Sequence, residues 1–387
     1  MPPAIFALSL AAFCIGTTEF IISGILFGVS RDLAVSIPVA GLLVTGYAAC
    51  VAIGGPIVGT LMSRVPVKTT ILGSMAIFSV GQVACALAST YELLLLARLI
   101  SALGHGVFFG VGSVAVTQLV PRERHGAALS LMVGGVTVAT VLGLPIGTAI
   151  GTAFGWRVSF AAIAVVAALA FVAIALTLPG RSKDDDQTEA PLALQVKQLA
   201  HQEVWLSYLI IVAIMVGQVA FGTFQVALLT EVTRIDPGVM VPIYLFFGGL
   251  GSVLGIWLGG RAADRSGAAA LPVALVGQIV CFLLFAVVMP NPIAAGVCLF
   301  LLGGFSVGFS TPVQVRIMHG ARAAPRLAAT LISMAYNIGI SSGAAVGAAL
   351  LSANVGYQAL PLTGALFSAI ALPLALLSIH LSRRGVS

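Results

Sequence analysis

Three ionisable side chains stand inside long apolar stretches of the chain. Glu19 lies in the stretch 4–29, and Arg98 and His105 lie in the stretch 91–118. If these stretches cross a bilayer, a carboxylate at that depth costs at least about 2.5 kcal/mol, so it indicates function by default. Loss of water favours the neutral form of Glu19, which suits a group that takes up and releases protons. The alternative is a structural carboxyl that hydrogen-bonds a neighbouring helix.

Arg98 and His105 are seven residues apart, so a helix would place them within about 20° of the same face. Histidine is the side chain most easily switched near neutral pH, which makes His105 a candidate for proton coupling. Two structural alternatives stay open. Arg98 could extend toward the outer membrane surface, and His105 could be a packed, hydrogen-bonded residue.

Enzyme chemistry is not indicated elsewhere in the chain. The segment 304–308 has the pattern G-x-S-x-G, but it lies in a predicted helix, whereas a nucleophile elbow needs a strand-to-helix turn. No H-E-x-x-H motif, P-loop or Cys/His cluster occurs, and the five cysteines fall in apolar runs. We therefore expect no catalytic site, no metal and no cofactor, and no ATP-driven transport by this chain alone.

The composition defines the class of protein that must hold these residues. Of 387 residues, 59% are apolar and 8% are charged, against roughly 25% charged in soluble domains. A helix needs about 20 apolar residues to cross a bilayer. We therefore predict an all-α membrane protein with twelve spans, at 4–29, 39–63, 70–89, 91–118, 127–152, 156–178, 204–232, 237–261, 271–289, 292–319, 328–353 and 357–381.

The basic residues predict the orientation of these spans. With both termini in the cytoplasm, 14 of the 18 Lys and Arg residues fall in cytoplasmic segments, as the positive-inside rule requires. The net charge of +6 is thus explained by topology, and no nucleic-acid partner is expected.

The chain divides into two similar halves. A polar segment, 180–203, separates a bundle of six spans in 1–179 from a second in 204–387, and Leu192, Val196 and Leu199 predict a short amphipathic helix within it. Small residues at four-residue spacing let membrane helices approach closely. Such spacing occurs twice, offset by 196 residues, at Gly143, Gly147 and Gly151 and at Gly339, Gly343 and Gly347. We predict two pseudo-symmetric bundles with a substrate site between them near the bilayer midplane.

These features resemble the major facilitator superfamily, and within it the twelve-span drug/proton antiporter group, in particular its sugar-efflux, arabinose-efflux and purine-nucleoside exporter cluster. The resemblance covers nearly the whole chain. It rests on Gly16-Thr17-Thr18-Glu19-Phe20, Ala97-Arg98-Leu99 with Gly104-His105-Gly106, the segment 141–147, Gly155-Trp156-Arg157 and Asn337-Ile338-Gly339.

The resemblance implies roles for particular residues. It links Arg98 to proton coupling. It also implies a conformational switch at Gly59, Arg64, Gly143, Pro145, Gly147, Gly260, Asp264, Arg265, Gly339 and Gly343. Two departures weaken this transfer. Ser63 stands where the superfamily has an acidic residue, and Leu144 separates Gly143 from Pro145.

In the superfamily, spans 1, 4, 7 and 10 line the central cavity. The corresponding polar and aromatic residues suit a neutral or weakly polar ligand, whereas a phosphate would require paired cations. The candidates for substrate binding are Thr18, Ser101, Gln218, Phe221, Gln225, Gln314, Tyr336 and Asn337. The alternative is that these polar groups hold neighbouring helices together.

We therefore expect a secondary exporter, a proton-coupled antiporter of sugars, nucleosides or drugs that works by alternating access. The alternatives are a proton-independent facilitator or a proton symporter of the same fold. The expected partners are the cargo, protons and the lipid bilayer, and the expected form is a monomer in the bacterial inner membrane. The sequence does not decide among the cargoes or the proton stoichiometry.

Overall fold

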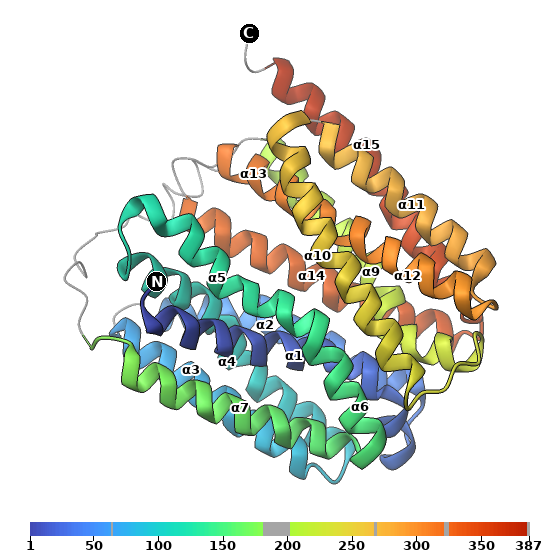
Figure 1. The fold of residues 1–387 in the computed structure, drawn as a ribbon, viewed down its shortest axis with the longest axis horizontal. Coiled ribbons are helices and arrows are strands. Elements are labelled where there is room, and N and C mark those ends of the chain that lie inside the picture. Colours follow the sequence, from blue (N-terminus) through green and yellow to red (C-terminus); the bar gives the residue numbers. More distant parts are fainter. Residues whose placement is uncertain (63–64, 181–201, 267–268, 321–324, 385–387) are drawn as a thin grey trace. The chain divides into compact units, whose positions relative to one another are not determined.

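The computed structural model describes residues 1–62, 65–180, 202–266, 269–320 and 325–384, and in this part of the chain all regular structure is helical (Figure 1). Twelve helical segments are long and apolar enough to cross a membrane. The prediction of an all-α protein with twelve spans is confirmed.

The chain forms two compact units. The first comprises Met1–Gln187 with Pro237–Pro242, and the second comprises Thr188–Asp236 with Ile243–Ser387. The boundary between them falls in the segment 180–203, where the sequence predicts a linker. The predicted amphipathic helix of Leu192, Val196 and Leu199 lies outside the described residues.

The first unit contains the first six spans. Its helices are α1 (Pro3–Asp32), α2 (Ile37–Leu61), α3 (Val67–Leu87), α4 (Tyr91–Gln118), η1 (Arg122–Arg124), α5 (His125–Val138), η2 (Ala139–Gly143), α6 (Leu144–Phe154) and α7 (Trp156–Thr177). Helix α4 packs against α2 and α3, and α3 lies beside α7 along one edge of this unit (Figure 1). Helix α1 contacts α5, α6 and α7, so Glu19 is carried by a helix at the centre of the unit.

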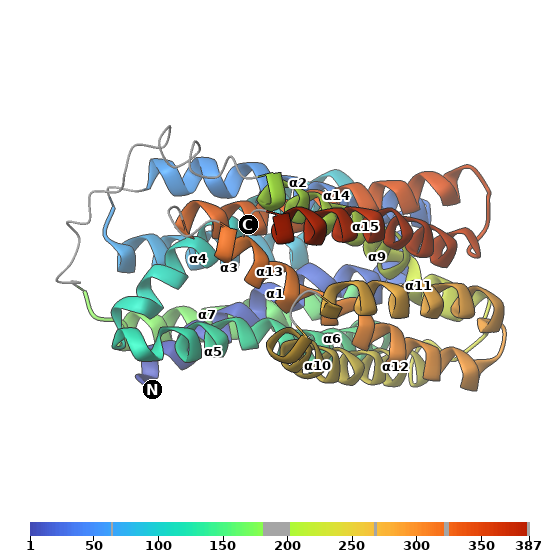
Figure 2. The same cartoon turned by 90° about the horizontal axis from the view of Figure 1, so that it is seen from above.

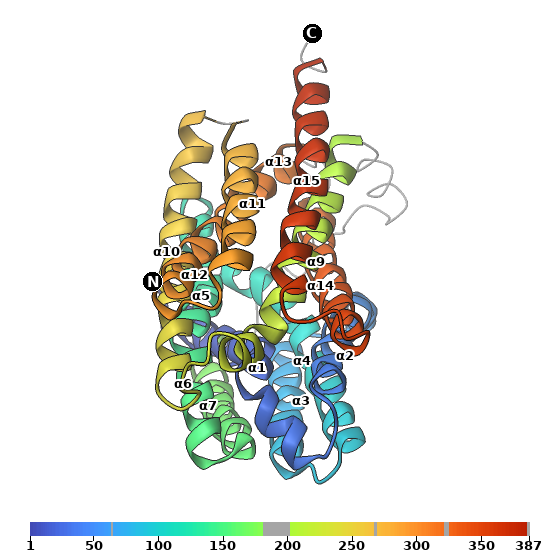
Figure 3. The ribbon, with the colours of Figure 1, turned by 90° about the vertical axis from the view of Figure 1, so that its right-hand side faces the viewer.

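The second unit contains the other six spans, apart from the first three residues of α10. Its helices are α9 (Gln202–Glu231), α10 (Met240–Ser266), α11 (Ala270–Val288), α12 (Pro292–Gly308), α13 (Ser310–Gly320), α14 (Pro325–Ser352) and α15 (Ala359–Arg384). Helix α9 packs between α14 and α15 (Figure 3). Helices α10, α11 and α12 lie together in the same unit (Figure 2).

Short polar residues and prolines define where several helices begin. The side chains of Ser36, Thr90 and Asn291 accept hydrogen bonds from the backbone N–H three residues ahead, at the starts of α2, α4 and α12. These bonds satisfy donors that have no partner within the helix. Proline occupies the first turn of α1, α2 and α12, where its missing N–H carries no penalty.

Two predicted spans are interrupted, and proline explains the position of each break. Span 5 is helix α5, a π-helical turn at Ala139–Gly143, and helix α6, with Pro145 in the first turn of α6. Span 10 is divided at Phe309 into α12 and α13, three residues before Pro312. Proline removes one helical hydrogen bond and crowds the preceding turn. The sequence analysis treats both spans as continuous.

Two further repeated features, one in the backbone and one in the sequence, accompany the glycine spacing. Gly155, between α6 and α7, and Gly356, between α14 and α15, have φ of 94° and 93°, which favours glycine. Both mark the turn between the fifth and sixth spans of a half. The segments 80–87 and 276–283, in α3 and α11, share the pattern V-G-Q-x-x-C-x-L at the same offset of 196 residues as the glycines. These matches support a duplication.

Candidate functional site

Arg98 is the centre of a buried polar cluster in the first unit. Its side chain is 0% exposed, and its guanidinium reaches two other helices. Nη1 donates to the carbonyl oxygen of Thr18 in α1 at 3.2 Å, and Nε donates to that of Leu43 in α2 at 3.4 Å. Nη2 has no hydrogen-bond partner. Arg98 therefore does not extend to the membrane surface, and its positive charge is retained inside the bundle.

Glu19 lies near the middle of α1, next to the Thr18 carbonyl that Arg98 contacts. Its side chain is partly exposed, and within the described residues it makes no direct ion pair or hydrogen bond. Arg98 interacts with it electrostatically. Every other acidic residue in the described helices lies toward a helix end or in a one-turn helix. Within the described helices Glu19 is thus the acidic residue placed farthest from a helix end, and the residue before it contacts the buried Arg98.

Tyr47 of α2 joins Arg98 to His105, and the sequence analysis does not identify it. The guanidinium carbon of Arg98 lies 4.3 Å from the centre of the Tyr47 ring. The Tyr47 hydroxyl is hydrogen-bonded to Nδ1 of His105 at 3.1 Å. Tyr47 is 1% exposed and His105 is 4% exposed. The structure thus brings together the three predicted proton-coupling residues through one additional aromatic side chain.

A second missed residue, Gln82 of α3, extends this cluster. Its Nε2 donates to Ser101 Oγ in α4 at 2.6 Å, and both side chains are fully buried. The signal that could have identified Gln82 is the repeated pattern V-G-Q-x-x-C-x-L, in which Gln278 is the counterpart. Gln278 is equally buried, but neither atom of its amide has a hydrogen-bond partner. The two halves therefore use equivalent glutamines differently.

The predicted substrate residues lie in both units, and they differ in what they can offer a ligand. Thr18, Ser101 and Phe221 are buried in helix packing, with Phe221 edge-on to Phe282 and Phe285. Their role in binding stays a prediction.

Five of the predicted residues in the second unit lie on three neighbouring helices, α9, α13 and α14. Gln314 of α13 is hydrogen-bonded to Tyr336 of α14, whose ring lies 6.4 Å from that of Phe309. Asn337, the next residue, keeps an unpaired Oδ1. Gln218 of α9 donates to the Ser306 carbonyl at 2.7 Å. Gln225 is partly exposed on the same helix.

Comparison with known proteins decides the family. The family profile described as Major Facilitator Superfamily matches residues 8–330. The chain belongs to the major facilitator superfamily. It is 34% identical to the inner membrane transport protein YdhP of Escherichia coli (strain K12), over 97% of this chain and 95% of the relative. It is 29% identical to a chloramphenicol resistance protein of Streptomyces lividans, over 92% of this chain and 91% of that protein.

The fold is also found in a solved structure. A bacterial homologue of the human lysosomal transporter Spinster, in an inward-facing and unoccupied conformation, matches with a TM-score of 0.78 at 18% identity, over 97% of this chain and 96% of that one. This major facilitator protein is thus a multi-pass membrane transporter and not an enzyme.

In this major facilitator protein, the predicted switch glycines fall into two groups. Gly143 and Gly147 pack against Thr17 and Ile21 of α1, and Gly339 and Gly343 pack against Met215 and Val216 of α9, so tightly that an added Cβ would overlap with them. Each pair of glycines therefore packs helices of its own unit against each other: Gly143 and Gly147 in the first unit, and Gly339 and Gly343 in the second. Gly59 and Gly260 have open space where a Cβ would stand.

The structure describes only some of the other predicted switch residues. Pro145 is buried in the first turn of α6, and Arg265 is exposed near the end of α10. Arg64, together with Ser63, lies outside the described residues, and so does the side chain of Asp264. The proposed roles of all the switch residues stay predictions.

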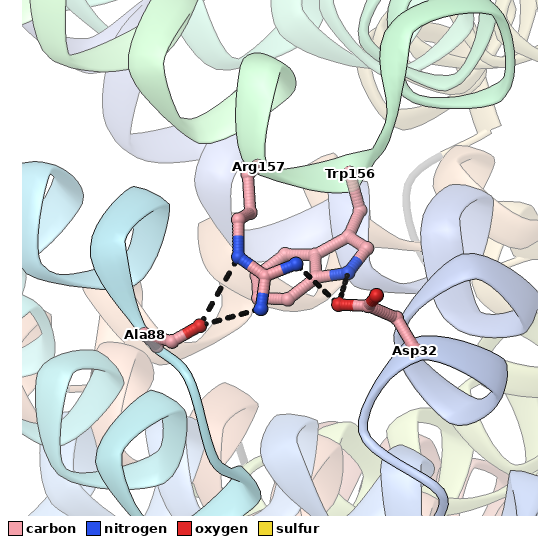
Figure 4. Close-up of polar contacts among 4 residues, drawn as sticks. All are labelled: Asp32, Ala88, Trp156 and Arg157. Atoms are coloured by element: carbon pink, nitrogen blue, oxygen red, sulfur yellow. Dashed lines mark hydrogen bonds and ion pairs between the residues drawn. The ribbon is translucent and has the colours of Figure 1, made fainter.

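Arg157 joins three elements of the first unit, as Figure 4 shows. Its Nε and Nη2 donate to the Ala88 carbonyl at the end of α3, at 3.1 and 2.7 Å. Its Nη1 donates to Asp32 at the end of α1, and Trp156 Nε1 donates to the same carboxylate oxygen at 3.1 Å. The Arg157 guanidinium also lies 4.2 Å from the centre of the Trp156 ring. This contact fixes the end of the helix that carries Glu19.

We expect Arg157→Lys to lower the free energy of unfolding by about 1–2 kcal/mol, because lysine cannot donate in a fork or stack on Trp156. The ion pair itself contributes little, since the Arg157 and Asp32 side chains are 37% and 47% exposed. The measurement is the thermal midpoint in detergent. Arg31→Lys, at an exposed position one residue before Asp32, is the control. Equal midpoints for both variants would contradict the prediction.

Proposed function

We propose that this protein is a proton-coupled exporter of small neutral or weakly polar molecules that works by alternating access. The observation that carries the proposal is the carboxylate of Glu19, which stands near the middle of α1, makes no hydrogen bond within the described residues and interacts electrostatically with the buried charge of Arg98. A group held in this way has two accessible states, because burial favours the protonated form and Arg98 favours the ionised form.

The proposed cycle uses this balance. A proton from outside neutralises Glu19, weakens its attraction to Arg98 and favours the return to the inward-facing state. The proton leaves to the cytoplasm as cargo binds. Each proton that moves down 100 mV supplies roughly 2.3 kcal/mol, which supports about a fiftyfold cargo gradient, since every 1.4 kcal/mol is tenfold.

The cargo class follows from the side chains of the second unit. Gln314, Tyr336, Asn337 and Gln218 offer amide and phenol groups, which hydrogen-bond neutral molecules. The name of the Streptomyces lividans relative supports a neutral drug, and the resemblance to sugar-efflux proteins supports sugars. The proposal includes a monomer in the bacterial inner membrane. The alternatives are a proton-independent facilitator or a symporter of the same fold.

The test is proton movement in proteoliposomes that contain a trapped pH-sensitive dye. Wild type, Glu19→Gln and the control Glu92→Gln are compared after addition of chloramphenicol or lactose. Glu92 is a suitable control because it is an exposed carboxylate in the first turn of α4. We expect cargo-evoked proton movement in wild type and Glu92→Gln, and none in Glu19→Gln, because glutamine cannot exchange a proton.

Two other outcomes would change the assignment. Full proton movement in Glu19→Gln would show that another group carries the proton. Cargo flux without proton movement in the wild type would make the protein a facilitator, with Glu19 as a structural or ligand-binding group.

A further inference from the structure

His105 and Tyr47 form a buried pair directly beside the Arg98 charge. The Tyr47 ring has the guanidinium of Arg98 on its face, 4.3 Å from its centre, and its hydroxyl is 3.1 Å from His105 Nδ1. Phe109 packs edge-on against the imidazole, at 5.4 Å between ring centres. His105 therefore stands in a confined space, in which any charge on its ring must be stabilised by the neighbouring side chains.

The charged and titratable groups that interact with the His105–Tyr47 pair come, together with Tyr47 itself, from four helices. Glu19 belongs to α1, Tyr47 to α2, Cys85 to α3 and Arg98 to α4. Of these, Arg98 carries a buried positive charge on the same helix as His105, two turns before it, and like charges repel. The carboxylate of Glu19 acts on Arg98 and Tyr47. An imidazolium at His105 would therefore be a second buried cation beside Arg98, and in the described part of the chain no carboxylate is paired with the imidazole.

The hydrogen bond itself favours a neutral imidazole. A cation over the face of a phenol makes its hydroxyl a stronger donor, and neutral histidine can accept at Nδ1 when the proton is on Nε2. Protonation would convert Nδ1 into a donor and reverse this bond. The stable arrangement is thus Tyr47 Oη–H donating to Nδ1 of His105.

We propose that His105 is a positioning residue and not a proton carrier. As a neutral acceptor it fixes the Tyr47 ring, and the ring in turn fixes the Arg98 guanidinium opposite Glu19. This inference rests on the proposed function for its effect on transport, but the protonation state of His105 can be measured without any cargo.

The test combines four single variants and one double variant with a spectroscopic readout. Asparagine places its amide where histidine has Nδ1, and glutamine places it nearer Nε2. We expect His105→Asn to retain most of the chloramphenicol-evoked proton movement. We expect His105→Gln, His105→Ala and Tyr47→Phe to reduce it about tenfold each, the effect of one hydrogen bond. Because the last two break the same bond, the double variant Tyr47→Phe/His105→Ala should be no worse than either.

The cargo-independent measurement is nitrogen-15 NMR of histidine-labelled protein in nanodiscs, with the His105 signals identified by their loss in His105→Asn. We expect the two ring-nitrogen shifts to remain those of a neutral Nε2–H imidazole from pH 5 to pH 8. A shift to the imidazolium values in this range, or loss of proton movement in His105→Asn equal to that in His105→Ala, would overturn the inference. If the wild type moves no protons but the NMR shifts stay constant, the proposed function fails and the protonation assignment stands.

Discussion

Replacing Arg98 with methionine is expected to abolish cargo-evoked proton movement, with a loss of at least about a hundredfold, and to leave the protein as stable as the wild type or more stable. The two effects separate because the groups that contact the guanidinium directly are neutral. Its partners are the Thr18 and Leu43 carbonyls and the Tyr47 ring. Replacing buried charges with apolar groups of similar volume is often neutral or stabilising, by about 1–4 kcal/mol.

The carbonyl partners of Arg98 do not depend on it. Thr18 and Leu43 lie inside α1 and α2, so each carbonyl also accepts the helical bond from the N–H four residues ahead. One further donor, Nη2, already lacks a partner. The charge therefore contributes little to the stability of the fold. Its removal, however, also removes the group that favours the ionised form of Glu19. In the proposed cycle, Glu19 would then keep its proton when cargo binds.

Arg98→Lys is the matched variant for this experiment. Lysine keeps a positive charge but cannot form the fork to two helices or lie flat on Tyr47. We expect an intermediate loss of proton movement, about tenfold, with the same thermal midpoint as the wild type. A large fall in the midpoint of Arg98→Met, in proportion to its loss of transport, would contradict the prediction and make Arg98 a structural residue.

The sequence predicts the spans and the isolated charges because both depend on composition along the chain. A carboxylate such as Glu19 stands out in an apolar run without any knowledge of the fold. Pro145 and Pro312 show the limit of this approach. A proline predicts a weakened helix, but whether the chain responds with a π-helical turn or a complete break depends on packing.

Periodicity could not determine which face each helix turns to its neighbours. The spans are apolar on nearly all sides, so the usual contrast between a buried and an exposed face is absent. Ser101 and Phe221 are buried against neighbouring helices, which the apolar pattern of their spans does not predict, and their role in binding stays a prediction. Tyr47 was missed for the same reason, because a tyrosine in a membrane span has many ordinary roles. Its significance depends on contacts with residues 51 and 58 positions away.

Gly255→Ala is expected to destabilise the protein by about 3 kcal/mol, whereas Gly260→Ala is expected to be neutral or to stabilise it by up to about 1 kcal/mol. Both glycines belong to α10 and are five residues apart. A Cβ at Gly255 would overlap with the backbone of Gly304 in α12, including its carbonyl oxygen. At Gly260 no atom lies within 4 Å of the added carbon.

The difference arises because the atoms that oppose Gly255 cannot rotate away. At Gly147 an added Cβ would meet the end of the Ile21 side chain, which can change its rotamer, so a smaller loss is expected there. Along the contact between α10 and α12, Gly251 and Gly259 face carbonyls of Phe300 and Gly308 in the same way. An alanine at Gly255 must therefore separate two helix backbones along several turns.

The measurement is the free energy of unfolding from titration with denaturing detergent, for the wild type and both alanine variants. Because alanine is the better helix former, a neutral or positive result at Gly260 shows that the substitution itself is harmless in α10. The loss at Gly255 is then the energy of the close backbone contact. Equal stabilities of the two variants would mean that α10 and α12 are not in backbone contact in the folded protein.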